Sequence, residues 1–185
     1  MKPKGNLKRM KKPDFWPKYG AKVPSKIKEQ IYQQYYSRDT LYVYCDMSML
    51  AGNSSMAVAC SYVSNASVIV KRQFVYPLKD SLMVNLYGEL KAVTFALTHF
   101  EKYIGFNQNV VIYSDVNYID EVIKEGMNFK KRPSLRKAQE ELSVLYKTQQ
   151  RNHPGLITVE YLPSDLKSFN PFYKSAHNAA KKMFH

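Results

Sequence analysis

The hydrophobic pattern of the chain changes in kind near residue 40. Before that point there is no clear apolar period, and the sequence predicts at most a short helix over residues 26–36. Residues 41–46 then read Leu-Tyr-Val-Tyr-Cys-Asp, a nearly continuous apolar run that is typical of a strand buried on both faces. Two further β-rich stretches, residues 56–63 and 67–76, follow this strand and predict an antiparallel meander.

The period becomes helical between residues 81 and 104. Six apolar side chains recur there at spacings of three and four residues: Leu86, Leu90, Val93, Leu97, Phe100 and Ile104. This stripe predicts a long amphipathic helix. Glu89 lies at the edge of the stripe, so we expect its carboxylate to face the sheet, where burying a charge is costly unless the charge is paired.

The second half of the chain alternates strands and helices. Residues 110–115 repeat the first strand, because they form an apolar run that closes on Asp. A short helix is predicted up to Gly126, a longer one up to Pro154-Gly155, a strand over residues 157–161 and a helix over residues 176–184. This order predicts an α/β fold in which helices cover a mixed sheet of about five strands.

Composition narrows the class of protein. The chain has 185 residues and is 45% hydrophobic, enough to bury the core of one domain, which excludes wholesale disorder. No apolar run approaches the roughly 18 residues of a membrane span, so we expect neither an anchor nor a signal peptide. Cys45 and Cys60 lack the spacing of a zinc or redox motif. We therefore expect buried, reduced thiols in a cytoplasmic protein.

The positive charge of the chain is confined to two segments. There are 28 Lys and Arg residues against 15 Asp and Glu, a net charge of +13. Residues 1–40 carry a net +8 and residues 124–151 a net +5, so the rest of the chain is neutral overall. Such a distribution indicates a polyanionic partner such as nucleic acid, although a solvated basic tail would give the same pattern in the first segment.

The same distribution divides the chain at residue 39. We expect residues 1–39 to form a basic N-terminal arm and residues 40–185 to form the folded domain. Trp16 and Tyr19 lie among the lysines of the arm, where they would either stack on bases or pin the arm to the domain. The sequence leaves these two alternatives open.

Three carboxylates are expected to meet at one edge of the sheet. The apolar runs that end in Asp46 and Asp115 are joined by a crossover helix, so their strands should be parallel and both side chains should lie at the carboxyl edge. Glu89 can join them from the helix. Clustered carboxylates require raised pKa values or bound cations, and hard oxygen ligands favour Mg²⁺ or Mn²⁺. Two such ions, about 4 Å apart, form the clamp used in phosphodiester hydrolysis.

Four short motifs resemble the type 1 ribonuclease H family. Asp46-Met-Ser is similar to its Asp-Gly-Ser, Glu89-Leu-Lys-Ala to its Glu-Leu-x-Ala, residues 112–118 to its Tyr-Thr-Asp-Ser-x-Tyr, and residues 175–182 to its Ala-Asp-x-Leu-Ala helix. The resemblance covers residues 40–184 and implies a ribonuclease H-like fold with a mixed five-stranded sheet. It also implies a metal-dependent endonuclease that cuts the RNA strand of RNA/DNA hybrids with two metal ions, by in-line attack of water.

The resemblance further implies which residues form the site. The metal ligands would be Asp46, Glu89 and Asp115, with His177 at a position that is usually Asp. A histidine there either is a softer fourth ligand that favours Mn²⁺ or is simply an exposed helix residue. Amide and basic side chains would contact the 2′-hydroxyls and phosphates of the hybrid. The expected substrate-binding residues are Ser48, Asn53, Asn85, Asn117, Lys130, Lys131 and Arg132.

Departures from the family pattern keep a second hypothesis open. Met47 replaces a small Gly, Val116 replaces a Ser, and the loop of residues 162–170 lacks the His that many family members carry. Together with His177, these departures favour a ribonuclease H-like module that binds nucleic acid without turnover. Retention of all three acidic residues favours the enzyme, since a binding module has no need of clustered carboxylates. We expect a monomer in either case.

Overall fold

A mixed five-stranded sheet forms the centre of the protein. The computed structural model describes residues 12–50, 55–82 and 84–185. The spatial order of the strands is β3-β2-β1-β4-β5, with β1 pairing antiparallel to β2 and parallel to β4. The strands are β1 (Thr40–Met49), β2 (Met56–Ser64), β3 (Ser67–Val75), β4 (Asn109–Ser114) and β5 (Ile157–Tyr161). This arrangement confirms the predicted fold class.

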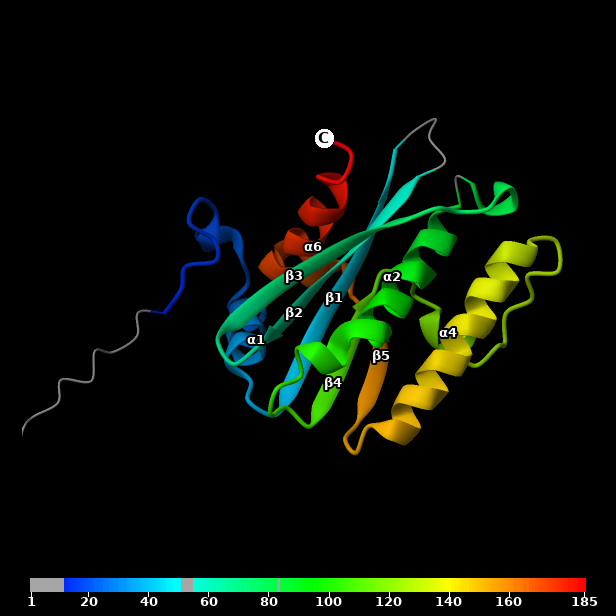
Figure 1. Cartoon of the computed structure of the whole chain (residues 1–185). Helices are drawn as coiled ribbons and strands as arrows, with labels where there is room; N and C mark the ends of the chain where they lie inside the picture. The colour runs from blue at the N-terminus through cyan, green and yellow to red at the C-terminus, as the bar shows by residue number, and fades with distance from the viewer. Residues whose placement is uncertain (1–11, 51–54, 83) are drawn as a thin grey trace, which may run out of the picture.

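Helices cover both faces of the sheet (Figure 1). On one face α2 packs against β1 and β2, and α4 packs on α2; on the other face lie α1 and α6. The helices are α1 (Ser25–Tyr36), α2 (Asn85–His99), α3 (Ile119–Ile123), α4 (Pro133–Asn152), α5 (Ser164–Phe169) and α6 (Pro171–Lys181), with 3-10 turns at Gly20–Lys22, Lys79–Ser81 and Phe100–Lys102. In the described ranges no helix combines the length and the apolar character of a membrane span.

Alternation along β1 divides its side chains between two cores. Val43 and Cys45 pack on the α2 side, and the buried free thiol of Cys60 lies beside that of Cys45. Tyr44 points to the other side, where it is buried with residues of α1 and α6. Because successive side chains of a strand point to opposite faces, Asp46 shares the face of Tyr44.

The described part of the N-terminal arm lies against the domain. Trp16 is only 3% exposed, and its Nε1 donates a hydrogen bond to the carbonyl oxygen of Phe169 at 2.7 Å. Ile31 on α1 is buried in the same cluster. The hydroxyl of Tyr19 accepts a hydrogen bond from Lys174 on α6 at 3.0 Å. In this structure both aromatic residues therefore pin the arm, and the division of the chain at residue 39 stays a prediction.

The C-terminal third differs from the pattern-based prediction. The last helix begins at Pro171 rather than at residue 176, because the side chain of Asn170 accepts hydrogen bonds from two backbone N–H groups of its first turn and proline suits the first helical position. Residues 164–169, expected to be loop, form α5. Outside this third, the long helix predicted between residues 81 and 104 also begins later than predicted, at Asn85. The early start of α6 brings Tyr173 into this helix.

Candidate functional site

The parallel pairing of β1 with β4 places two aspartates at corresponding positions. Tyr44 lies opposite Tyr113, and their rings stack with centroids 5.1 Å apart. Asp46 and Asp115 each follow two residues later, so their side chains share the face of the two tyrosines. β4 ends at Ser114, and Asp115 is therefore the first residue beyond the strand.

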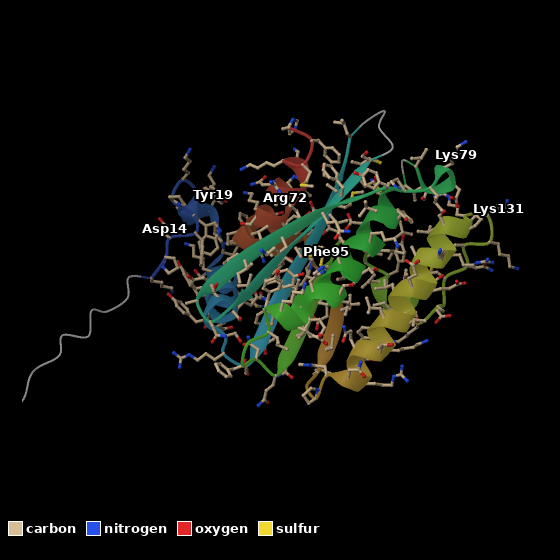
Figure 2. All side chains as sticks on the ribbon, viewed as in Figure 1. Asp14, Tyr19, Arg72, Lys79, Phe95 and Lys131 are labelled. Carbon is tan, nitrogen blue, oxygen red and sulfur yellow. The ribbon has the colours of Figure 1, made fainter. Side chains whose placement is uncertain are left out.

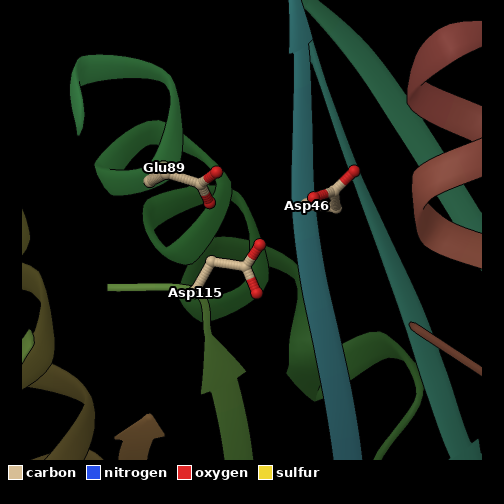
Figure 3. Close-up of side chains that lie close together, drawn as sticks. All are labelled: Asp46, Glu89 and Asp115. Atoms are coloured by element: carbon tan, nitrogen blue, oxygen red, sulfur yellow. The ribbon is translucent and has the colours of Figure 1, made fainter. Parts of the chain in front are cut away.

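Glu89 reaches the two aspartates from the other side of the sheet. It lies on α2, and Figure 3 shows its carboxylate meeting Asp115 just past the end of β4, next to Asp46 on β1. One oxygen from each of the three carboxylates lies within 4.8 Å of the other two. The predicted convergence of these residues is present in the structure.

Side chains from α5 and α6 hold the two aspartates. The hydroxyl of Tyr173 donates to Asp46 Oδ1 at 2.8 Å and also lies 3.0 Å from Asp115 Oδ2. The ammonium of Lys167 contacts that same Asp115 oxygen in an ion pair. The Nδ1 of His177 lies 2.9 Å from Asp46 Oδ2. Both oxygens of Asp46 are thus engaged by α6.

Burial sets the electrostatics of the cluster. It raises the pKa of Asp46, and the hydrogen bond from Tyr173 and the proximity of His177 oppose that rise. Burial raises the pKa of Glu89 well above its ordinary value, the negative charges of Asp46 and Asp115 raise it further, and Lys167 lowers it. Burial and the neighbouring Asp46 also raise the pKa of Tyr173, so its hydroxyl stays a neutral donor.

Two buried carboxylate oxygens in the cluster have no hydrogen-bond partner among the described residues. They are Glu89 Oε2 and Asp115 Oδ1. A buried anionic oxygen without a partner is costly, and a bound cation removes that cost. Three carboxylates that converge on one point are the hard oxygen ligands that Mg²⁺ and Mn²⁺ prefer. The residues present therefore fit a divalent metal ion.

His177 lies beside this group of three rather than within it. Its Nδ1 is directed at Asp46, and 42% of its side chain is exposed. The metal-ligand geometry found among the described residues comprises Asp46, Glu89 and Asp115. The role of His177 as a fourth ligand stays a prediction.

Val116 and Met47, the two residues that differ from the family motifs, pack against the interior of the domain. Val116 is 7% exposed and packs in the core on the α2 side. Met47 is partly buried against that same core. Both side chains are therefore accommodated by the hydrophobic core on the α2 side of the sheet.

The expected substrate-binding residues come from separate parts of the fold. Ser48 is half-buried on β1, while Asn85 and Asn117 are exposed at the start of α2 and just after Asp115. Asn53 lies outside the described residues. Three exposed basic residues directly precede α4 and line a groove with Leu86 and Phe129: Lys130, Lys131 and Arg132.

Tyr19 and Lys131, one from each basic segment, lie at opposite ends of the molecule. Figure 2 shows Lys131 near one end and Tyr19 near the other, with the sheet between them.

Lys167 and Tyr173 are the site residues that the sequence analysis missed. They come from segments assigned to a loop and to the region ahead of the last predicted helix. The signal that was available is Asn170-Pro171, a helix-start pair that places Tyr173 in the first turn of α6.

Comparison with known proteins supports the fold. RNase H1 of the halophilic archaeon Halobacterium salinarum NRC-1 is 14% identical with a TM-score of 0.56, over 78% of this chain and 98% of that one. The N-terminal RNase H domain of a Mycobacterium tuberculosis protein is 14% identical with a TM-score of 0.53, over 80% and 99%. LC11-RNase H1 in complex with an RNA/DNA hybrid is 13% identical with a TM-score of 0.52, over 78% and 99%.

These similarities are structural. No protein-family model matches the sequence, and no curated protein sequence matches it. Identity this low establishes the fold alone, because one fold supports many functions. The chain has a ribonuclease H-like fold, as the four sequence motifs implied.

Proposed function

We propose that the protein is a metal-dependent endonuclease that hydrolyses the RNA strand of RNA/DNA hybrids. The observation that carries the proposal is the convergence of Asp46, Glu89 and Asp115 within 4.8 Å, with two of their buried oxygens unpartnered. The substrate class rests on the sequence motifs and on the fold shared with LC11-RNase H1, which was solved with such a hybrid.

Each group of the cluster has a distinct task in this proposal. Asp46, Glu89 and Asp115 would hold Mg²⁺ or Mn²⁺, which when bound activates water and stabilises charge on the phosphate. Tyr173 keeps Asp46 and Asp115 in place through its hydroxyl. Two ions are what the resemblance implies, and His177 beside Asp46 is the side chain available as a ligand for the second.

Substrate binding is assigned to the polar and basic residues around the cluster. Asn85 and Asn117 offer exposed amides that can donate to and accept from 2′-hydroxyl groups. The groove beside Lys130, Lys131 and Arg132 offers positive charge for phosphates. It lies next to the first turn of α2, the helix that carries Glu89.

A binding module without turnover is the second candidate function. The observation in its favour is that Lys167, Tyr173 and His177 already occupy three carboxylate oxygens of the two aspartates. This candidate predicts tight, salt-dependent binding of the hybrid and no cleavage with either metal.

Cleavage of a labelled RNA/DNA hybrid in Mg²⁺ and in Mn²⁺ separates the two candidates. We expect metal-dependent cleavage by the wild type and a loss of roughly a hundredfold or more in Asp46→Asn. Asp120→Asn is the matched control, because Asp120 is an exposed acid of α3 paired only with Lys124 among the contacts of the described residues. Equal cleavage by Asp46→Asn and the wild type would refute the proposed site, and hybrid binding without cleavage would favour the second candidate.

A further inference from the structure

We propose that Lys167 contributes a positive charge to the acidic centre through its ion pair with Asp115 and that it limits the centre, in the absence of nucleic acid, to one divalent cation. The inference deepens the proposed function and rests on it only in that the three carboxylates bind such a cation. It refines the expectation of two ions, because it assigns the second positive charge to a side chain of the protein itself.

The contact between Lys167 and Asp115 is partly shielded from solvent. The ammonium pairs with Asp115 Oδ2, and the side chains are 38% and 15% exposed. The lysine Nζ also lies 4.9 Å from the centroid of the Tyr173 ring, a distance at which a cation is attracted to the face of an aromatic ring. Lys167 is therefore held at the cluster by two groups, unlike a lysine that is free in solvent.

The short helix that carries Lys167 is anchored on both sides. Leu166, the residue of α5 directly before Lys167, is buried, and Asn170 is buried just after α5, where it caps α6. The carbonyl of Phe169 accepts the hydrogen bond from the Trp16 indole. These anchors fix the backbone from which the lysine extends, and they place its ammonium within reach of Asp115.

The carboxylate oxygens that remain open are enough for one cation. Tyr173 and His177 engage the two oxygens of Asp46, and Lys167 and Tyr173 share Asp115 Oδ2. The buried oxygens left without a partner are one from Glu89 and one from Asp115. A cation bound there would be completed by Asp46, which lies in the same group.

The charge balance of the acidic centre also favours a single divalent cation. The three carboxylates carry three negative charges when ionised, and the ammonium of Lys167 cancels one of them. One divalent cation neutralises the remaining two. A second divalent cation would make the centre positive and would lie close to the ammonium, which repels it.

The test is a titration of the full-length, nucleic-acid-free protein with Mn²⁺, followed by the EPR signal of the free ion. We expect one ion per wild-type chain. In Lys167→Gln and in Lys167→Met, which keeps the aliphatic stem, we expect a second ion and a first ion bound roughly tenfold more tightly. Lys167→Arg keeps the charge and should bind one ion.

Lys174→Gln is the matched control, because Lys174 is an exposed lysine of α6 that contacts Tyr19 rather than the acids. It should titrate as the wild type does. Two ions of comparable affinity in the wild type would overturn the inference, as would an unchanged or weaker first ion in both neutral variants. A wild type that binds no Mn²⁺ would overturn the proposed function as well, so the two failures are distinguishable.

Discussion

Met47 and Gly88 share one space between β1 and α2. A Cβ added to Gly88 would lie 2.2 Å from the terminal methyl carbon of Met47, far inside van der Waals contact. Met47 follows Asp46 and Gly88 precedes Glu89, so each member of the pair is the sequence neighbour of one of the three acids. The glycine gives the methionine its room, and this explains how the domain accepts a large side chain directly after Asp46.

The two residues should therefore be energetically coupled. Ala in place of Gly88 gains about 1 kcal/mol of helix propensity, whereas the overlap with Met47 costs about 1–3 kcal/mol. We expect Gly88→Ala to lower the free energy of unfolding in the wild type and to raise it in a Met47→Ala background. Urea denaturation of the four proteins measures both effects. A change of the same sign in both backgrounds would contradict the shared space.

Neutralising Glu89 should stabilise the metal-free protein. Burial raises the folded-state pKa of Glu89 well above 4.5, its ordinary value, so ionisation of this carboxyl opposes folding. Below the unfolded-state pKa both states are protonated and the penalty is absent. It grows as the pH rises from there towards the folded-state pKa. We expect Glu89→Gln to melt higher than the wild type near neutral pH, with the difference vanishing in acid.

Thermal melts in a chelator across this pH range measure the effect. Glu101→Gln is the control, since Glu101 is an exposed acid of the 3-10 turn that follows α2. A difference in melting temperature between Glu89→Gln and the wild type that is constant with pH would show that the carboxyl is not the cause.

Binding of a divalent metal ion at the three carboxylates should stabilise the folded protein. A cation that binds only the folded state stabilises it by RT ln(1 + [L]/Kd), about 2.7 kcal/mol at a concentration of 100 times Kd. We expect Mn²⁺ to raise the melting temperature of the wild type and of Asp120→Asn, and to leave Asp115→Asn nearly unchanged. An equal rise in Asp115→Asn would place the ion elsewhere.

The acidic cluster could be predicted because the local hydrophobic pattern around each of its three residues indicates where that residue lies in the fold. Asp46 and Asp115 each close an apolar run, and the helix between those runs dictates that the strands be parallel. Glu89 falls at the edge of an apolar stripe with a helical period. The parallel strands and the helix face then bring the three together, although β1 continues past Asp46 to Met49 through its pairing with β2 rather than ending at the aspartate.

The residues that hold the aspartates were not predictable in this way. Lys167 and Tyr173 act across 52 and 58 positions of sequence, and their placement depends on how α5 and α6 dock on the sheet. That docking is set by buried contacts of Trp16 and Phe172, which no periodicity in the second half of the chain reveals. Hydrophobic pattern predicts which face an element buries, whereas the exact angle of a short helix follows from packing.

Trp16 should contribute to the stability of the whole domain. Its indole is almost fully buried and donates to the carbonyl of Phe169. We expect Trp16→Ala to cost about 3–5 kcal/mol in the free energy of unfolding. Trp16→Phe keeps part of the packing and should cost less, with the lost hydrogen bond contributing about 1 kcal/mol. Phe106→Ala is the control, because Phe106 is 97% exposed.

Denaturation in urea tests this contribution and indicates where the arm can be cut. A truncation that removes residues 1–11 keeps Trp16 and α1 and should therefore still fold cooperatively. A truncation at residue 40 removes part of the core and should not fold to the native state. A stable, cooperative domain after the longer truncation would show that the arm is separable.

The basic groove beside α2 should dominate the salt dependence of hybrid binding. Each phosphate contact contributes roughly 0.7–0.9 to the slope of log K against log [salt], so replacing Lys130, Lys131 and Arg132 by Gln should lower the slope by roughly 2. The matched control replaces three exposed lysines of the N-terminal segment around Asp14 and Tyr19, which Figure 2 shows away from Lys131: Lys12, Lys18 and Lys22. We expect this control to change the slope little, because the groove adjoins the helix that carries Glu89 and the other end does not.

Binding titrations at several salt concentrations, with a catalytically inactive Asp46→Asn background to prevent cleavage, measure both slopes. Equal losses from the two triple variants would mean that the hybrid extends across the body of the protein, and a loss from the control alone would move the phosphate contacts to the N-terminal end.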